Sequence, residues 1–166
     1  MKYLLTLTFT LMSLSLYSQS FWDDVFDSPI TINRDSLCWE MEKRFVKTLN
    51  NWRLKNGLNE LEYDYDMQSL LTVPWNERQV QTGMAGHGDG NESFKNRSNG
   101  VGIFGGGECC GINHISDLGD KSEIFLLYKG SPSHWKILTN PRFKYVSVSV
   151  MYDQETSRYY SVVNLR

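Results

Sequence analysis

The sequence predicts an α+β domain in which helices come first along the chain and an antiparallel pair of strands comes last. Three observations predict it: an apolar stripe at helical spacing near residues 35–56, later helical segments with capping signals, and two strand patterns near the C-terminus. The chain has 166 residues, 40% of them hydrophobic, which fits one globular unit with a real core.

The first twenty residues have the pattern of a secretory signal peptide. Met1-Lys2 is followed by an uncharged run, Tyr3 to Tyr17, and then by Ser18-Gln19-Ser20. A basic start, a short apolar run and small residues at its end are the parts of such a signal, and the run is short for a membrane span. We therefore expect residues 1–20 to be removed and the mature protein to be secreted or periplasmic, with no transmembrane segment.

A polar and aromatic lead, residues 21–35, precedes the first strong element, a helix from about Asp35 to Asn56. Gly57 stands where a C-terminal cap belongs. Apolar residues recur at steps of four, four, four and three, which places one stripe along the helix and predicts its buried face: Leu37, Met41, Phe45, Leu49 and Trp52.

A second helix is predicted to begin after a cap at Asp64 or Asp66 and to reach about Gln81. Pro74 lies inside it and predicts a kink or a break. The side chains expected to face inward are Met67, Leu70, Leu71 and Trp75.

From Gly83 to about Ile115 the sequence has the composition of loops, apart from a short helix expected near residues 92–97. A third helix is expected over about 121–129, with Asp120 and Glu123 forming a capping box. Its predicted inner face is Ile124, Leu127 and Tyr128.

The last part of the chain predicts a short helix and a hairpin. Ser131 is a natural N-cap and Pro132 suits the first helical position, so His134 falls in the first turn. The helix dipole disfavours a charged imidazole there, which predicts a neutral His134. Two strands follow, Tyr145 to Tyr152 and Arg158 to Leu165.

Candidate functional residues gather in glycine-rich segments between residues 86 and 141. His87 lies within Gly86 to Gly90, and Glu108 lies within Gly105 to Gly111. The second glycine run lacks the lysine and hydroxyl of a phosphate-binding loop, so nucleotide binding is rejected. A net charge of −2 gives no bulk basic character that would argue for nucleic acid.

Three cysteines make an odd count for an exported chain. Cys38 could pair with Cys109 or Cys110, or the two adjacent cysteines could form a vicinal disulfide, and the sequence leaves these alternatives open. A cysteine nucleophile with His87 or His134 as its base is a further alternative, although no protease signature surrounds it.

In their order along the chain, several segments resemble the CAP superfamily, also called SCP-like: the cysteine-rich secretory, antigen 5 and pathogenesis-related proteins and their bacterial relatives. The resemblance covers about residues 36–166. Its segments are Leu49 to Arg53, Gly57 to Asp64, Gly86-His87, Arg97 with Gly100, Gly107-Glu108, Ser131 to His134 with Ile137 to Phe143, and Tyr159 to Asn164.

The resemblance implies a three-layer α-β-α sandwich with a small antiparallel sheet and a cleft where two histidines and two glutamates converge. Transferred by position, these are His87, Glu108 and His134, with Glu123 as a fourth residue that its capping box also explains. The chain departs from the family at three places: Cys109 replaces an asparagine, Tyr128 replaces a tryptophan, and Leu71 to Trp75 interrupts an alanine-rich helix.

Two neutral imidazoles, His87 and His134, could hold zinc or another divalent ion, and Glu108 could complete the site or orient a water. No cofactor is required. The sequence lacks a helical zinc motif, a serine triad signature and a cofactor loop, which favours binding over catalysis. We expect a secreted, non-catalytic module that binds a small molecule, lipid, peptide or cell-wall fragment. The alternatives are a metal-dependent, peptidase-like hydrolase and a structural protein of the cell envelope.

Overall fold

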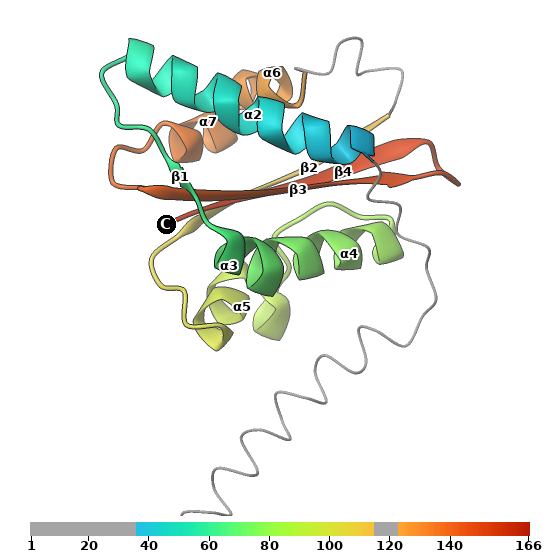
Figure 1. The fold of residues 1–166 in the computed structure, drawn as a ribbon. Coiled ribbons are helices and arrows are strands. Elements are labelled where there is room, and N and C mark those ends of the chain that lie inside the picture. Colours follow the sequence, from blue (N-terminus) through green and yellow to red (C-terminus); the bar gives the residue numbers. More distant parts are fainter. Residues whose placement is uncertain (1–35, 115–122) are drawn as a thin grey trace, which may run out of the picture. The chain divides into compact units, whose positions relative to one another are not determined.

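A computed structural model describes residues 36–114 and 123–166 (Figure 1). The predicted signal peptide and the lead at residues 21–35 lie outside the described residues, as does Asp120 of the expected capping box. The described residues belong to one unit, Ile32–Arg166.

A four-stranded sheet forms the middle layer of this unit. Its strands are β1 (Glu62–Tyr63), β2 (Gly107–His114), β3 (Tyr145–Asp153) and β4 (Arg158–Leu165), in the spatial order β1-β3-β4-β2. β1 runs parallel to β3, whereas β3 with β4 and β4 with β2 are antiparallel. The predicted C-terminal hairpin is confirmed, but the loop predicted up to Ile115 is wrong at residues 107–114, where β2 forms the edge of the sheet.

Three helices cover one face of the sheet: α2 (Ser36–Lys55), α6 (Glu123–Gly130) and α7 (Pro132–Leu138) (Figure 1). The predicted stripe of α2 packs in the main core, with Met41, Phe45 and Leu49 fully or almost fully buried. In α6 the predicted inner face is wrong at Leu127, which is 39% exposed, while Phe125 is buried instead.

The other face is covered by α3 (Tyr65–Met67), a π-helical turn η1 (Gln68–Thr72), α4 (Val73–Thr82), a 3₁₀ turn η2 (Gly90–Glu92) and α5 (Phe94–Gly100). Asp64 caps α3, because its carboxylate accepts the N–H of Met67 at 2.9 Å. Pro74 sits in the first turn of α4, directly after the π-helical turn. The predicted break is wrong, because the backbone stays helical through Thr72 and Val73 and only the type of helix changes there. Helices on both faces confirm the α-β-α fold class.

Polar side chains join this second layer to the sheet, beside an apolar contact of Trp75 with Cys110 and Val162. Gln68, Thr72 and Asn76 recur at steps of four and are all buried. The Thr72 hydroxyl bonds to the hydroxyl of Ser147, and the Asn76 amide donates to Ser149. The prediction that Leu70 faces inward is wrong, because Leu70 is 49% exposed and the buried stripe beside it is polar.

Side chains close the outer edge of β3 beyond its short pairing with β1. The carbonyl of Val148 accepts hydrogen bonds from Gln68 Nε2 at 2.9 Å and from the Tyr63 hydroxyl at 3.2 Å. The N–H of Val150 donates to the carboxylate of Glu42 at 2.8 Å. Unpaired strand edges attract other strands, so these contacts protect this side of the sheet.

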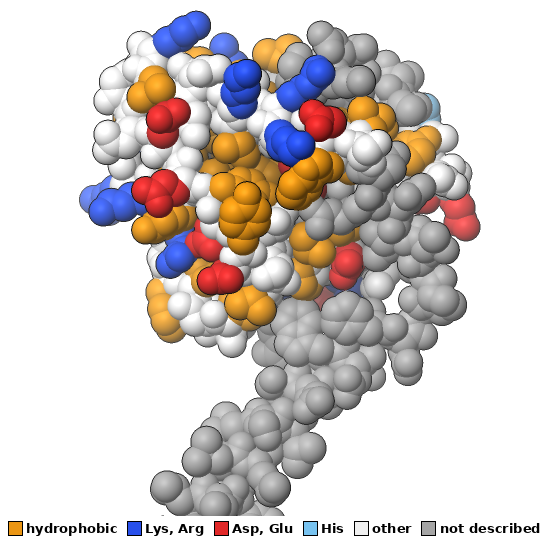
Figure 2. Space-filling model, in the orientation of Figure 1, with side chains coloured by type: hydrophobic (Ala, Val, Ile, Leu, Met, Phe, Trp, Pro, Cys, Tyr) orange, Lys and Arg blue, Asp and Glu red, His pale blue; other side chains and the backbone are white. Residues whose placement is uncertain are grey.

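Acidic and basic side chains are interspersed among hydrophobic ones on the face of the molecule shown in Figure 2. Among the described residues, no helix combines the length and the apolar character needed to cross a membrane.

Candidate binding cleft

Glu108 is the buried centre of the candidate site. It lies on β2 next to its first residue, and its side chain is only 1% exposed. Arg97 Nη2 donates to both carboxylate oxygens, at 2.8 and 3.0 Å, and His87 Nδ1 lies 3.1 Å from Oε1. A buried carboxylate is stable only when it is paired and hydrogen-bonded, and these two partners meet that need.

Arg97 organises the loop side of the site from α5. Its guanidinium lies 3.7 Å from the ring centroid of Trp75, and its Nε donates to the carbonyl of Glu92 at 2.6 Å. Nη2 also donates to the carbonyl of His87 at 3.2 Å. A planar guanidinium suits this combination of stacking and forked hydrogen bonding. In the sequence Arg97 stood out only as part of the family resemblance, so its role at Glu108 was missed.

The loop that carries His87 is fixed by backbone contacts. Trp75 Nε1 donates to the carbonyl of Gly86 at 2.9 Å, and the N–H of Phe94 donates to the carbonyl of His87 at 3.1 Å. Gly88 has a φ of 66°, and a Cβ there would lie 2.9 Å from Trp75 and would overlap the carbonyl of Glu92. The tight turn therefore requires glycine directly after the histidine.

His87 presents an accessible imidazole, with its side chain 54% exposed. The hydrogen bond to Glu108 raises the pKa of His87 above its ordinary value and outweighs the lowering effect of burial. His87 is therefore the histidine of this site that more readily carries a proton.

His134 reaches the site from the first turn of α7, as the sequence predicted. Ser131 is the extended N-cap residue, but its hydroxyl bonds to that of Ser133 at 3.2 Å rather than to the helix backbone. The His134 ring packs edge-on against Tyr128 with centroids 5.0 Å apart. Burial lowers the pKa of His134, and nearby His87 lowers it further, so a neutral ring is favoured as predicted.

The two imidazoles approach each other from opposite faces of the sheet. His87 Nδ1 lies 3.8 Å from Cys110 Sγ on the α4 face, whereas His134 packs on Tyr128 on the α6 face. Their ring centroids are nevertheless 6.5 Å apart. Neighbouring strands of a sheet lie only about 4.8 Å apart, which leaves no gap for side chains to meet through the sheet. The two rings therefore approach each other around the outer edge of β2.

The candidate metal ligands are only partly arranged for an ion. One ion bound to both imidazoles through bonds of 2.0–2.1 Å would bring the ring centroids to about 5 to 6 Å, slightly closer than they are. A different group, His87, Glu108 and Cys110, has donor atoms that all lie within 4.8 Å of one another. The side chain of Glu123 lies outside what the structure describes, so its place in the cleft stays a prediction.

The three cysteines form no disulfide with one another, and all are buried. Burial raises the pKa of the Cys109 and Cys110 thiols far above the ordinary range, and the charge of Glu108 raises it further. The thiolate is the nucleophilic form of cysteine. Burial and the raised pKa therefore argue against the cysteine nucleophile considered from the sequence.

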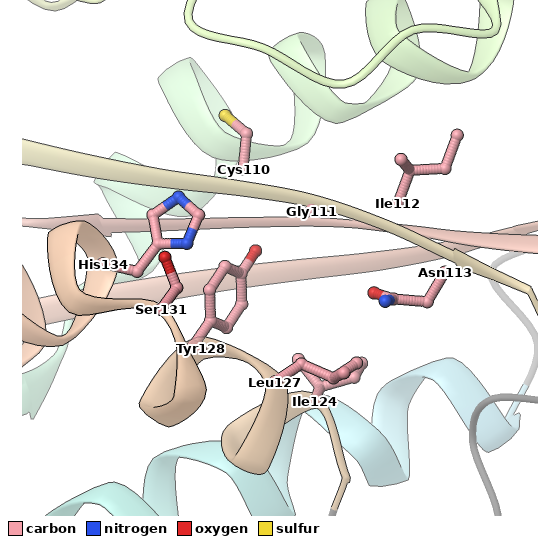
Figure 3. Close-up of a pocket in the computed structure, with 9 residues that line it drawn as sticks. All are labelled: Cys110, Gly111, Ile112, Asn113, Ile124, Leu127, Tyr128, Ser131 and His134. Atoms are coloured by element: carbon pink, nitrogen blue, oxygen red, sulfur yellow. The ribbon is translucent and has the colours of Figure 1, made fainter.

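A pocket of about 240 Å³ adjoins His134 on the α6 face (Figure 3). Ile124, Leu127 and Tyr128 give it apolar walls, and Asn113, Ser131 and His134 supply polar groups. Gly111 also lines the pocket, and Tyr128 packs closely over it, because a Cβ at Gly111 would lie 3.2 Å from the Tyr128 hydroxyl. Cys110 and Ile112 point to the opposite side of β2 (Figure 3).

Comparisons with known proteins agree with this architecture. The model of the CAP, or cysteine-rich secretory protein, family matches residues 46–165. No curated protein matches the chain in sequence. An outer surface protein from Borrelia burgdorferi has a similar structure, with a TM-score of 0.66 and 16% identity over 76% of this chain and 91% of that one.

Two longer proteins contain a similar fold. An extracellular protein with an SCP domain from Bacillus anthracis gives a TM-score of 0.62 at 17% identity, over 76% of this chain and 40% of that one. A cysteine-rich secretory protein from Staphylococcus aureus gives a TM-score of 0.57 at 15% identity, over 76% of this chain and 38% of that one. At these identities the similarity shows the fold.

Proposed function

Because the chain belongs to the cysteine-rich secretory protein, or CAP, family, we propose that it is an exported, non-catalytic binding module. Its cleft is formed by His87, Glu108 and His134 and takes a lipid, a peptide or a cell-wall fragment. Residues 1–20 supply the export signal in this proposal, and the extracellular SCP-domain protein of similar fold supports it.

The observation that carries the proposal is the state of Glu108. A general base must reach the proton that it removes, directly or through one water. Here both carboxylate oxygens accept from Arg97, one of them also contacts His87, and the side chain is 1% exposed. Glu108 therefore serves to orient His87, and the accessible imidazoles are left to contact a ligand.

A second candidate, a metal-dependent hydrolase, is favoured by one observation, the grouping of His87, Glu108 and Cys110 donor atoms. Zinc bonds of about 2.0–2.3 Å require donor atoms roughly 3.3 to 3.8 Å apart, so the group would have to contract. Arg97 would also have to release at least one oxygen of Glu108. A bound ion would supply Lewis acidity, while Glu108 would hold His87 in position.

The test is calorimetry with zinc, and then with phospholipid vesicles, peptides and muropeptides, on the protein from residue 21 onward. The variant His87→Ala/His134→Ala should lose ligand binding and keep a cooperative unfolding transition, while His114→Ala at the far end of β2 should bind normally. Binding without turnover of any probe supports the module. Zinc-dependent turnover supports the hydrolase, and unfolding of the double variant supports a structural role for the histidines.

A further inference from the structure

The two outer edges of the sheet are treated differently by the fold. On β3, Glu42, Gln68 and Tyr63 hydrogen-bond to the outward peptide groups of Val148 and Val150. On β2, by contrast, no described residue outside β4 hydrogen-bonds to the outward peptide groups of Glu108, Cys110 or Ile112. An open strand edge is a template for an extended chain.

The register identifies which peptide groups of β2 face outward. Tyr145 and Arg166 exchange both backbone hydrogen bonds, which fixes the alternation along β3 and β4. The β4 residues that do not bond to β3 point their peptide groups toward β2. Their partners in the register are Cys109, Gly111 and Asn113, so the peptide groups of these three residues face β4. Glu108, Cys110 and Ile112 therefore present their N–H and C=O groups to the open edge.

The pocket lies where a side chain of an added strand would enter. Residues directly opposite each other on paired strands point to the same face. A residue opposite Gly111 would thus point to the α6 face, into the pocket walled by Ile124, Leu127 and Tyr128. Those walls suit an apolar side chain (Figure 3). Tyr128 packs directly over Gly111, where a Cβ would lie 3.2 Å from its hydroxyl, so the added side chain would enter beside Gly111 rather than above it.

The histidine pair marks one end of this track. The rings of His87 and His134 meet beyond the edge of β2 beside Cys110. The neighbours of the apolar residue in an added strand would point to the opposite face. The one opposite Cys110 would lie near the imidazole of His87, which suits a polar side chain.

We propose that the ligand of this cleft is an extended peptide that adds to the outer edge of β2 as a further strand, with an apolar side chain in the pocket beside Gly111 and a polar neighbour at His87. This inference rests on the proposed binding function and names its ligand class. Main-chain hydrogen bonds would supply affinity, and the pocket would supply specificity.

The experiment uses seven-residue peptides of alternating polar and β-branched residues, with leucine at the centre and aspartate next to it. Binding is followed by calorimetry and by amide hydrogen exchange. On binding, the N–H groups of Cys110 and Ile112 should exchange at least tenfold more slowly. Those of Gly111 and Asn113, already bonded to β4, should change little.

Two matched perturbations test the hydrogen bonds themselves. N-methylation of peptide amides on the side facing β2 should weaken binding roughly tenfold or more per lost bond, and methylation of the alternate amides should not. In the protein, Ile112→Pro removes an outward N–H, which an edge strand tolerates, and Ile112→Thr keeps it. Only the proline variant should lose affinity, and the methylated peptides give the same test on the unchanged protein.

The outcomes separate the two proposals. Peptide binding that is indifferent to the methylation pattern and leaves the two β2 amides unchanged would overturn strand addition while the binding module stands. Binding of muropeptides or vesicles but of no peptide would also overturn strand addition and leave the binding module standing. So would slower exchange of these amides that appears only when the protein dimerises at high concentration. If no probe binds at all, both proposals fail.

Discussion

The Arg97–Glu108 pair should be the most sensitive polar contact of the described fold. The two side chains are 7% and 1% exposed, so neither charge is well solvated. Removing one member of a buried pair leaves the other charge uncompensated, which costs about 3–5 kcal/mol. Arg97→Met keeps apolar bulk against Trp75, so its effect should come mainly from the lost charge and hydrogen bonds.

We expect Arg97→Met to lower the free energy of unfolding by about 3 kcal/mol or more, a large part of the 5–15 kcal/mol of an ordinary domain. Adding Glu108→Gln should restore roughly half or more of the loss, because a neutral amide no longer needs the guanidinium. The stabilities of both variants are measured by guanidinium chloride unfolding followed by circular dichroism. The comparison holds if m, the slope of unfolding free energy against denaturant concentration, is unchanged.

The matched control is Arg78, whose ion pair with Glu92 spans 3.4 Å between side chains that are 39% and 42% exposed. Exposed pairs contribute about 0–1 kcal/mol, so Arg78→Ala should change stability by no more than about 0.5 kcal/mol. If Arg97→Met costs no more than this control, burial adds nothing to the Arg97–Glu108 pair. If the double variant is as unstable as the single one, an unpaired Glu108 charge is not the cause of the loss.

Three further predictions follow from the described contacts. The pKa of His87 is raised in the folded state, so protonated His87 contributes its full stabilisation below about pH 6.5 and loses it as pH rises through the folded-state pKa. The wild type should therefore lose stability relative to His87→Gln between pH 6 and 8. Denaturant titrations that give both proteins the same change in unfolding free energy with pH would contradict this. Gly88→Ala should destabilise the fold more than Gly57→Ala, since both glycines have positive φ but only at Gly88 would a Cβ overlap another residue. Thermal melts should show a loss of about 1 kcal/mol for Gly57→Ala. Equal losses of stability in the two variants would count against the tight turn at Gly88. The three buried cysteines should react with a thiol reagent only as fast as the protein unfolds; rapid labelling of the native protein would show that one of them is accessible.

Much of the first helical layer could be predicted because its signals are local. The stripe from Leu37 to Trp52 depends on spacing within one helix, and Pro132 after Ser131 marks a helix start. β2 was missed for the opposite reason. Its two glycines, its asparagine and its glutamate are of types depleted in strands, and its structure depends on pairing with β4, about fifty residues further along the chain.

The candidate site shows the same division. His87, Glu108 and His134 could be singled out because of their residue types and the motifs around them, and the structure places them close together. Arg97 was marked only by its place in the family resemblance, which gave it no partner, and one arginine in a short helix is usually a surface residue. Likewise, the burial of Gln68 instead of Leu70 depends on contacts with the sheet that no local pattern reveals.

The closed edge of β3 also limits how copies of the protein could polymerise through their sheets. A filament grows only if each subunit offers two complementary edges, one for the preceding subunit and one for the next. Glu42 and Gln68 occupy peptide groups of β3, and only the two-residue strand β1 lies beyond it. The described residues of a subunit that joined another through β2 would therefore offer no second long edge for growth. Association by this route would stop at a pair, so the molecule could keep one reactive edge in a concentrated environment without forming fibres.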